Sequence, residues 1–303
     1  MTFIEAQHLT KRYGEKVAVD DLSFTVRPGI VTGFLGPNGS GKSTTMRMIM
    51  GLDYPTRGRV TVNGKRYHDL DWPLREIGAL LEAKAIHPGR SARAHLQMLA
   101  EANRIPLRRV GEVLELVGLA SVAGQRAGKF SLGMAQRLGM AAALLGDPGV
   151  LICDEPVNGL DPDGIRWVRN LLKGLAAEGR TVFVSSHLMS EMALTADEVV
   201  VIGRGRFLAQ QPVAELTARS AARFVRVRSP QLDRLRVALD EHGAETDLRD
   251  GALTVRGMDR EAIGDLAASL PVTLHELAAE TASLEEAFME LTEQSIEYQG
   301  ADR

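Results

Sequence analysis

Hydrophobic and polar positions alternate over the first thirty residues, with turn residues between the runs, as at Leu22 to Val26. A period of two is typical of strands that bury one face, so this region predicts short antiparallel strands. Ile30 to Leu35 is a compact apolar run that predicts another strand, and a helical run follows through Met50. Thr56 to Gly64 predicts a further hairpin segment.

The middle of the chain changes period. From about Trp72 to Asp147 the apolar positions have helical spacing, which predicts a helical insertion at about residues 84–147. Val150 to Cys153 and Thr181 to Val184 are short apolar runs between turn residues, as expected of buried parallel strands. Val199 to Ile202 and Arg206 to Leu208 predict a closing hairpin.

The pattern changes again after Pro212, where strands and helices alternate. Ser283, followed by Glu286 three residues later, forms a capping box that predicts a helix over Leu284 to Thr292. The other predicted elements are strands at Phe224 to Arg228, Ala252 to Arg256 and Val272 to Leu277, and helices at Gln231 to Glu241 and Arg260 to Ser269. We therefore expect one domain over residues 1–215 and a small α+β domain over residues 220–303.

Composition narrows the class of protein. The 303 residues fit two domains of ordinary size, and 45% hydrophobic with 25% charged residues is a globular balance. The formal net charge of −3 gives no basic excess, so no nucleic-acid partner is expected. Cys153 is the only cysteine, which excludes an internal disulfide. No apolar run reaches the roughly 18 residues of a membrane span, and the N-terminus lacks a signal-peptide pattern, so we expect a soluble, intracellular chain.

A glycine-rich string carries the first chemical signal. Gly36 to Ser43 reads GPNGSGKS and lies between a predicted strand and a predicted helix, as a phosphate-binding loop requires. Its backbone N–H groups and the positive end of the helix would hold phosphate oxygens. Lys42 would reach the β- and γ-phosphates, and the Ser43 hydroxyl would bind Mg²⁺. The chain therefore has an α/β nucleotide-binding core.

Two adjacent carboxylates narrow the reaction. Asp154 and Glu155 directly follow the apolar run of Val150 to Cys153. Asp154 could hold the metal through water, and Glu155 could take a proton from an attacking water. The sequence has no guanine-reading Asn-Lys-x-Asp string, which disfavours a GTPase.

Four further strings, in order over residues 1–210, resemble the motifs of ABC-transporter ATPases. Phe130 to Arg137, FSLGMAQR, resembles the signature motif, and Gly159 to Pro162 resembles the D-loop. His187 matches the switch histidine, and Tyr13 matches the aromatic residue that stacks on adenine.

The resemblance implies ATP hydrolysis with Mg²⁺ in a head-to-tail dimer of two copies. Ser131 and Gly133 would hold the ATP of the other copy, Asp161 would link the two sites, and His187 would contact the γ-phosphate while Glu155 acts as general base. It also implies integral-membrane permease subunits, no direct membrane insertion, and a place on the inner face of the cell membrane. The expected nucleotide-binding residues are Tyr13, Gly36, Pro37, Asn38, Gly39, Ser40, Gly41, Lys42, Ser43, Thr44, Glu82, Ser131, Gly133 and Asp161; the expected metal-binding residues are Ser43, Asp154 and Glu82.

Two departures from the common pattern point to a branch of the family. Leu132 replaces a usual signature glycine, and Met134 also departs. Glu82 stands where the family usually has the Q-loop glutamine. Both departures resemble the bacitracin-exporter-like branch, which implies export of a drug, a peptide antibiotic or a lipophilic compound.

Two alternatives stay open at this point. One is a soluble ABC ATPase without a permease that acts on ribosomes or DNA, disfavoured by the single cassette and the net charge of −3. The other is a non-enzymatic nucleotide-binding regulator, disfavoured by the presence of Glu155.

Overall fold

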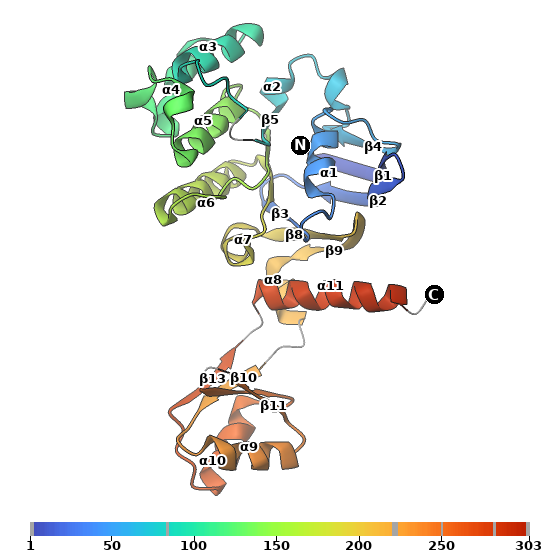
Figure 1. Cartoon of the computed structure of the whole chain (residues 1–303), viewed down its shortest axis with the longest axis vertical. Coiled ribbons are helices and arrows are strands. Elements are labelled where there is room, and N and C mark those ends of the chain that lie inside the picture. Colours follow the sequence, from blue (N-terminus) through green and yellow to red (C-terminus); the bar gives the residue numbers. More distant parts are fainter. Residues whose placement is uncertain (1–2, 83–84, 220–223, 250, 281–282, 301–303) are drawn as a thin grey trace. The chain divides into compact units, whose positions relative to one another are not determined.

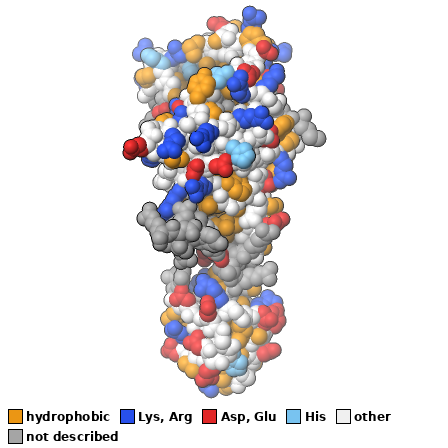
Figure 2. Space-filling model, turned by 90° about the vertical axis from the view of Figure 1, so that its right-hand side faces the viewer, with side chains coloured by type: hydrophobic (Ala, Val, Ile, Leu, Met, Phe, Trp, Pro, Cys, Tyr) orange, Lys and Arg blue, Asp and Glu red, His pale blue; other side chains and the backbone are white. Residues whose placement is uncertain are grey.

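The protein is represented by a computed structural model that describes residues 3–82, 85–219, 224–249, 251–280 and 283–300. It divides into two compact units, Met1–Pro212 and Val213–Arg303, whose elements are drawn in Figure 1. Figure 2 shows basic and acidic side chains mixed over the face in view, consistent with the nearly balanced composition. Among the described residues, no helix is long and apolar enough to cross a membrane.

The first unit is built on a six-stranded sheet in which five strands are parallel. Its order is β5 (Ile77–Leu80), β6 (Val150–Cys153), β7 (Thr181–Ser185), β3 (Val31–Leu35), β8 (Glu198–Gly203) and β9 (Arg206–Pro212), and only the last pair is antiparallel. Every residue of β3, β6 and β7 is buried, which explains why their sequences are mostly apolar. Along the chain the strands alternate with α1 (Lys42–Ile49), α6 (Pro162–Ala177) and α7 (Met189–Thr195).

A three-stranded antiparallel sheet accompanies this core, as the alternating N-terminal sequence predicts. Its order is β2 (Lys16–Val26), β1 (Ile4–Tyr13) and β4 (Arg57–Val62). Phe24 of this sheet packs on Phe34 and Phe183 of the larger sheet, with ring centroids 4.9–5.6 Å apart within the trio. One hydrophobic core therefore joins the two sheets.

The predicted helical region contains a strand that the sequence analysis missed. Its helices are α2 (Pro73–Glu76), α3 (Ala92–Ala102), α4 (Arg108–Leu116) and α5 (Leu132–Leu144), and 3₁₀ turns lie at Tyr67–Asp69, Ala120–Val122 and Ala127–Lys129. A helical pattern starting at Trp72 is wrong at Ile77–Leu80, because this segment forms β5 and pairs with β6. A Cβ atom on Gly78 would lie 2.0 Å from the carbonyl oxygen of Ala143, so the glycine allows α5 to pack directly on β5.

The second unit is a small α+β domain, as the sequence predicts. After α8 (Val213–Arg219) come β10 (Phe224–Arg228), α9 (Leu232–Glu241), β11 (Glu245–Arg249), β12 (Ala252–Arg256), α10 (Arg260–Ser269), β13 (Glu276–Glu280) and α11 (Leu284–Gly300). The antiparallel sheet order β11-β12-β10-β13 with this β-α-β-β-α-β sequence is the ferredoxin-like arrangement. Its core is separate from that of the first unit.

The structure of this unit differs from the prediction in three places. A strand over Val272 to Leu277 is wrong in its start, because the Thr273 N–H donates to Gln231 Oε1 (3.1 Å) and β13 begins only at Glu276. Strand β11 was not expected, since its sequence ETDLR is mostly polar. The capping box is present, with Ser283 N–H donating to Glu286 Oε2 at 2.8 Å, but helix α11 extends beyond Thr292.

The contact between α5 and β5 generates a stability prediction. Gly78→Ala should lower the free energy of unfolding by about 1–3 kcal/mol, because the new methyl group meets backbone rather than a movable side chain. Gly174→Ala in α6 is the matched control: nothing lies within 4 Å of its Cβ position, so stability should rise by up to about 1 kcal/mol. Chemical denaturation of the full chain measures both, and equal midpoints would contradict the close packing.

Candidate active site

The glycine-rich loop between β3 and α1 has a conformation that only glycine permits at two positions. A Cβ on Gly36 would lie 2.4 Å from Ser40 Oγ and 2.7 Å from the Ile202 carbonyl oxygen. Gly41, which precedes α1, has a φ of 105°, and a Cβ there would lie 2.5 Å from the Ala18 carbonyl oxygen. The loop is therefore packed against the sheet on its inner side.

Buried polar groups of this loop fit an anionic ligand. Ser40 is buried, and its hydroxyl has no hydrogen-bond partner in the described part of the chain. Lys42 is also buried, and its Nζ donates to the carbonyl oxygens of Gly36 (2.6 Å) and Pro37 (3.3 Å). Together with the N-terminus of α1, these groups suit phosphate oxygens.

The charge of Lys42 responds to two opposed effects. Burial lowers the pKa of its ammonium group, and this is the larger effect. The nearby carboxylates of Glu155 and Asp154 raise the same pKa. The fold therefore brings the lysine of the loop close enough to both acidic residues for their charges to act on it.

Asp154 lies at the carboxyl end of β6, between two neighbouring strands. Its N–H donates to the Leu80 carbonyl oxygen of β5 at 2.8 Å. The Ser185 hydroxyl, at the end of β7, donates to Asp154 Oδ1. The same hydroxyl oxygen accepts the backbone N–H of Glu155 at 3.0 Å. Strands β5 and β7 thus fix the orientation of both acidic residues.

Glu155 has a left-handed backbone, with a φ of 51° that is uncommon for a residue other than glycine. Its carbonyl oxygen accepts a hydrogen bond from Gln136 Nε2 at 3.4 Å. Its Oε2 lies 2.7 Å from Nδ1 of His187 and accepts the His187 backbone N–H at 3.3 Å. The structure therefore brings together Glu155 and His187, which are 32 residues apart in sequence.

Tyr13 is tied to the edge of the same unit by its hydroxyl group. The residue is 47% exposed, its OH donates to Asp53 Oδ2 (3.1 Å), and Lys11 Nζ lies 4.9 Å from the ring centroid. Arg47 binds the same Asp53 oxygen at 2.7 Å and holds the pKa of that carboxyl below its usual value. The aromatic ring is thus fixed and partly open, as a stacking surface requires.

Ser131 and Asp161 each cap a helix. Ser131 Oγ accepts the Met134 N–H at the start of α5 (3.2 Å), and Asp161 Oδ1 accepts the Gly164 N–H at the start of α6 (2.8 Å). A Cβ on Gly133 would lie 3.3 Å from Leu160, so the two helix starts are neighbours. In the part of the chain that the structure describes, no hydrogen bond or ion pair joins either residue to Lys42.

Glu82 lies two residues beyond β5, whose Leu80 pairs with Cys153 directly before Asp154. Its side chain is exposed, and its carbonyl oxygen accepts the Ala85 N–H at 3.3 Å. No hydrogen bond or ion pair of its side chain to the two acidic residues occurs among the described residues. The structure therefore places Glu82 near the correct strand end but does not join it to the site.

Sequence reasoning missed two residues that contact the acidic pair, Ser185 and Gln136. Ser185 stands two positions before His187, and Gln136 lies inside the signature string. The signal for Ser185 was available as a polar residue that ends a buried strand. Gln136 had no such signal, because its contact with Glu155 depends on how α5 packs.

The class of the protein follows from two neighbouring features. One is a strand, a glycine-rich loop and a helix with a buried lysine, and the other is a strand that two carboxylates follow. Together they define a P-loop nucleotide hydrolase. Comparison with known proteins gives the family. The "ABC transporter" family model matches residues 19–158, and a model for a domain of unknown function matches residues 223–285.

Curated relatives extend this likeness beyond residues 19–158. An uncharacterized ABC transporter ATP-binding protein of Bacillus subtilis (strain 168) is 36% identical over 300 residues, 98% of each chain. The bacitracin transport ATP-binding protein of Bacillus licheniformis is 43% identical over 222 residues, 72% of each chain. A lantibiotic transport ATP-binding protein of Streptococcus pyogenes is 34% identical over 208 residues, 69% of this chain and 90% of its own.

Solved structures agree with these relatives. One ATP-binding subunit of an ABC transporter superposes with a TM-score of 0.65 at 28% identity, covering 71% of this chain and 92% of its own. The dimeric structure of a bacterial ABC transporter cassette gives a TM-score of 0.64 at 26% identity, covering 69% and 98%. The chain belongs to the ATP-binding proteins of ABC transporters, and it is an ATPase cassette that binds and hydrolyses ATP.

The cap at the start of α6 generates a prediction about Asp161. Asp161→Ala should lower the free energy of unfolding by about 1 kcal/mol, because the Gly164 N–H loses its acceptor. Asp161→Ser keeps an acceptor oxygen and should lose only a small part of this. Urea denaturation of the full chain measures the difference, and equal stability of the alanine and serine variants would contradict the cap.

Proposed function

We propose that this chain is the ATP-hydrolysing subunit of an exporter that moves a drug, a peptide antibiotic or a lipophilic compound through separate membrane subunits. The observation that carries the hydrolytic part is the Glu155–His187 pair in the same unit as the buried Lys42. Export is supported by the likeness to bacitracin and lantibiotic transport proteins. The departures at Leu132 and Glu82 support the same branch.

Glu155 is the general base in this proposal. Its Oε2 accepts hydrogen bonds from His187, and its Oε1 would accept the proton of an attacking water. His187 contacts the γ-phosphate and orients that water. Lys42 leaves the carbonyl oxygens of its own loop to donate to the β- and γ-phosphates, where its charge stabilises the developing negative charge.

The remaining loop residues and Tyr13 bind the nucleotide. Tyr13 stacks on adenine with the ring that Asp53 holds in place. The loop residues supply N–H groups and hydroxyls to the phosphates; they are Gly36, Pro37, Asn38, Gly39, Ser40, Gly41, Ser43 and Thr44.

The residues at the loop also fit Mg²⁺ as a cofactor. The described residues contain no group of three or more His, Cys, Asp or Glu side chains that could hold a metal alone. A Mg²⁺ ion bound with ATP draws ligands from phosphate oxygens and water, so few protein ligands are needed. Ser43, Asp154 and Glu82, which follows β5, would hold it, and the ion would neutralise phosphate charge.

A second copy of the chain completes each site in this proposal. Ser131 and the amides of α5, including that of Gly133, face the ATP bound to the loop of the other copy. Asp161, at the neighbouring helix start, links the two sites. Within one chain the Ser131 hydroxyl caps its own helix and has no described bond to Lys42, which is consistent with this arrangement. The dimer of the bacterial ABC transporter cassette also supports it.

The permease is expected to dock beside the signature segment. A pocket there is lined mainly by apolar side chains and small residues, among them Ile86, Pro88, Phe130 and Leu132. The pocket lies between the residues that follow Glu82 and the start of α5. A permease segment bound there would contact the segments that carry Glu82 and Ser131. The proposed location is the inner face of the cell membrane, through this permease.

Glu155→Gln tests the catalytic assignment. Turnover should fall by about 100-fold or more, because the amide cannot accept the proton of water, while nucleotide affinity stays within a few-fold. The variant should accumulate as an ATP-bound dimer in size-exclusion runs with ATP and Mg²⁺. In the native host it should also fail to restore resistance to a peptide antibiotic after deletion of the gene. Wild-type turnover without a dimer shift would show that Glu155 is not the base.

Ser131 can be tested by mixing two inactive chains. A Lys42→Ala chain and a Ser131→Arg chain form a heterodimer with one intact site, composed of Lys42 from one copy and Ser131 from the other. ATPase activity should then exceed the sum of the two variants measured separately. Each variant alone is the control. A mixture of wild type with a Lys42→Ala, Ser131→Arg double variant shows whether one intact site supports hydrolysis. If it does, heterodimers of the two single variants without any gain would contradict action of Ser131 in trans.

A further inference from the structure

Ser185 contacts both acidic residues of the site with a single hydroxyl group. It is the last residue of β7, is fully buried, donates to Asp154 Oδ1 and accepts the Glu155 N–H at 3.0 Å. A serine hydroxyl has one proton to donate, so the donation to Asp154 leaves its lone pairs for the amide. Asp154 Oδ1 is the acceptor of the hydroxyl proton.

We propose that Ser185 is a positioning residue that orients the carboxylates of Asp154 and Glu155 for hydrolysis. This inference rests on the proposed function, which assigns the metal to Asp154 and the water to Glu155. The side chains meet because β6 and β7 are parallel neighbours in register, with Cys153 opposite Val184. Asp154, Glu155 and Ser185 therefore lie at the same edge of the sheet.

The backbone of Glu155 explains why an external anchor matters. A left-handed backbone at a residue other than glycine is retained when surrounding contacts determine it. Ser185 holds the amide on one side of Glu155, and His187 holds the carboxylate on the other. Without the hydroxyl, the peptide bond before Glu155 is free to rotate, and the Glu155 carboxylate moves away from the attacking water. This lowers the rate of hydrolysis more than the affinity for ATP.

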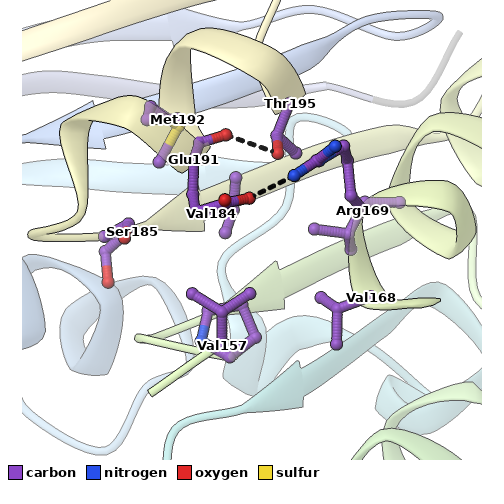
Figure 3. A pocket seen from close by; sticks show the side chains of 11 residues that line it. Val157, Val168, Arg169, Val184, Ser185, Glu191, Met192 and Thr195 are labelled. Carbon is purple, nitrogen blue, oxygen red and sulfur yellow. Dashed lines mark hydrogen bonds and ion pairs between the residues drawn. The ribbon is translucent and has the colours of Figure 1, made fainter. Parts of the chain in front are cut away.

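The surroundings of Ser185 allow a precise substitution. Figure 3 shows Ser185 at the edge of a small cavity, with Val184 and Met192 beside it and an ion pair between Arg169 and Glu191 at the far side. The lining next to Ser185 is largely apolar. Threonine and valine have nearly the same shape, so this pair of variants differs essentially in the hydroxyl alone.

The experiment compares Ser185→Thr with Ser185→Val in the full chain. Ser185→Val should lower kcat by about 10- to 100-fold, in the range of a misplaced catalytic group, with KM for ATP within about threefold. Ser185→Thr should retain kcat within about threefold. Affinity for a fluorescent ATP analogue without Mg²⁺, which needs no turnover, should stay within about threefold of wild type for both, because the glycine-rich loop is unchanged.

Thr32→Val is the matched control for a buried hydroxyl. Thr32 is fully buried in β3, next to β7, and its hydroxyl has no partner among the described residues. Its kcat and thermal unfolding midpoint should equal those of wild type or exceed them slightly.

Equal kcat values for the threonine and valine variants would overturn the inference. If Ser185→Val fails to fold, Ser185→Ala takes its place, and a kcat within threefold of wild type would again overturn it. An active Glu155→Gln enzyme would instead overturn the proposed function. An inactive Glu155→Gln enzyme together with an active Ser185→Val enzyme would leave the function intact and refute only the role of Ser185.

Discussion

The parallel pairing of β6 with β7, and of β7 with β3, is the constraint on which the site depends. Parallel strands end at the same edge of a sheet, so three segments from distant parts of the sequence meet there. β3 delivers the glycine-rich loop, β6 delivers Asp154 and Glu155, and β7 delivers Ser185 and then His187. A shift of one residue in either pairing would move side chains to the opposite face of the sheet and separate the residues of the site.

Close backbone packing holds the loop and α5 against their neighbouring strands. Gly36 and Gly41 let the loop lie against Ile202 and Ala18, and Gly78 lets α5 lie against β5. These contacts link the loop to β8 and β2, and the signature helix to the sheet. Glycine in this protein therefore allows close contacts between elements, in addition to its usual role in turns.

The loop and the acidic pair were predictable because their signals are local. A strand, a glycine-rich turn and a helix occur in direct succession, and the carboxylates immediately follow an apolar run. Strand β5 was not predictable in this way, because IGAL fits a helix as well as a strand and only its pairing with β6 decides. The contacts of Ser185 and Gln136 join residues 19 to 31 positions apart, so they needed the packed sheet and α5.

The ferredoxin-like unit has a hydrophobic core of its own, built from residues such as Val227, Leu239 and Val255. Among the described residues, this core shares no side chain with the cluster that holds Phe24, Phe34 and Phe183. The two parts of the chain can therefore diverge under separate selection, with the catalytic machinery retained while the second unit is exchanged or lost. The lantibiotic transport relative is shorter than this chain, since 90% of its length aligns to 69% of this chain.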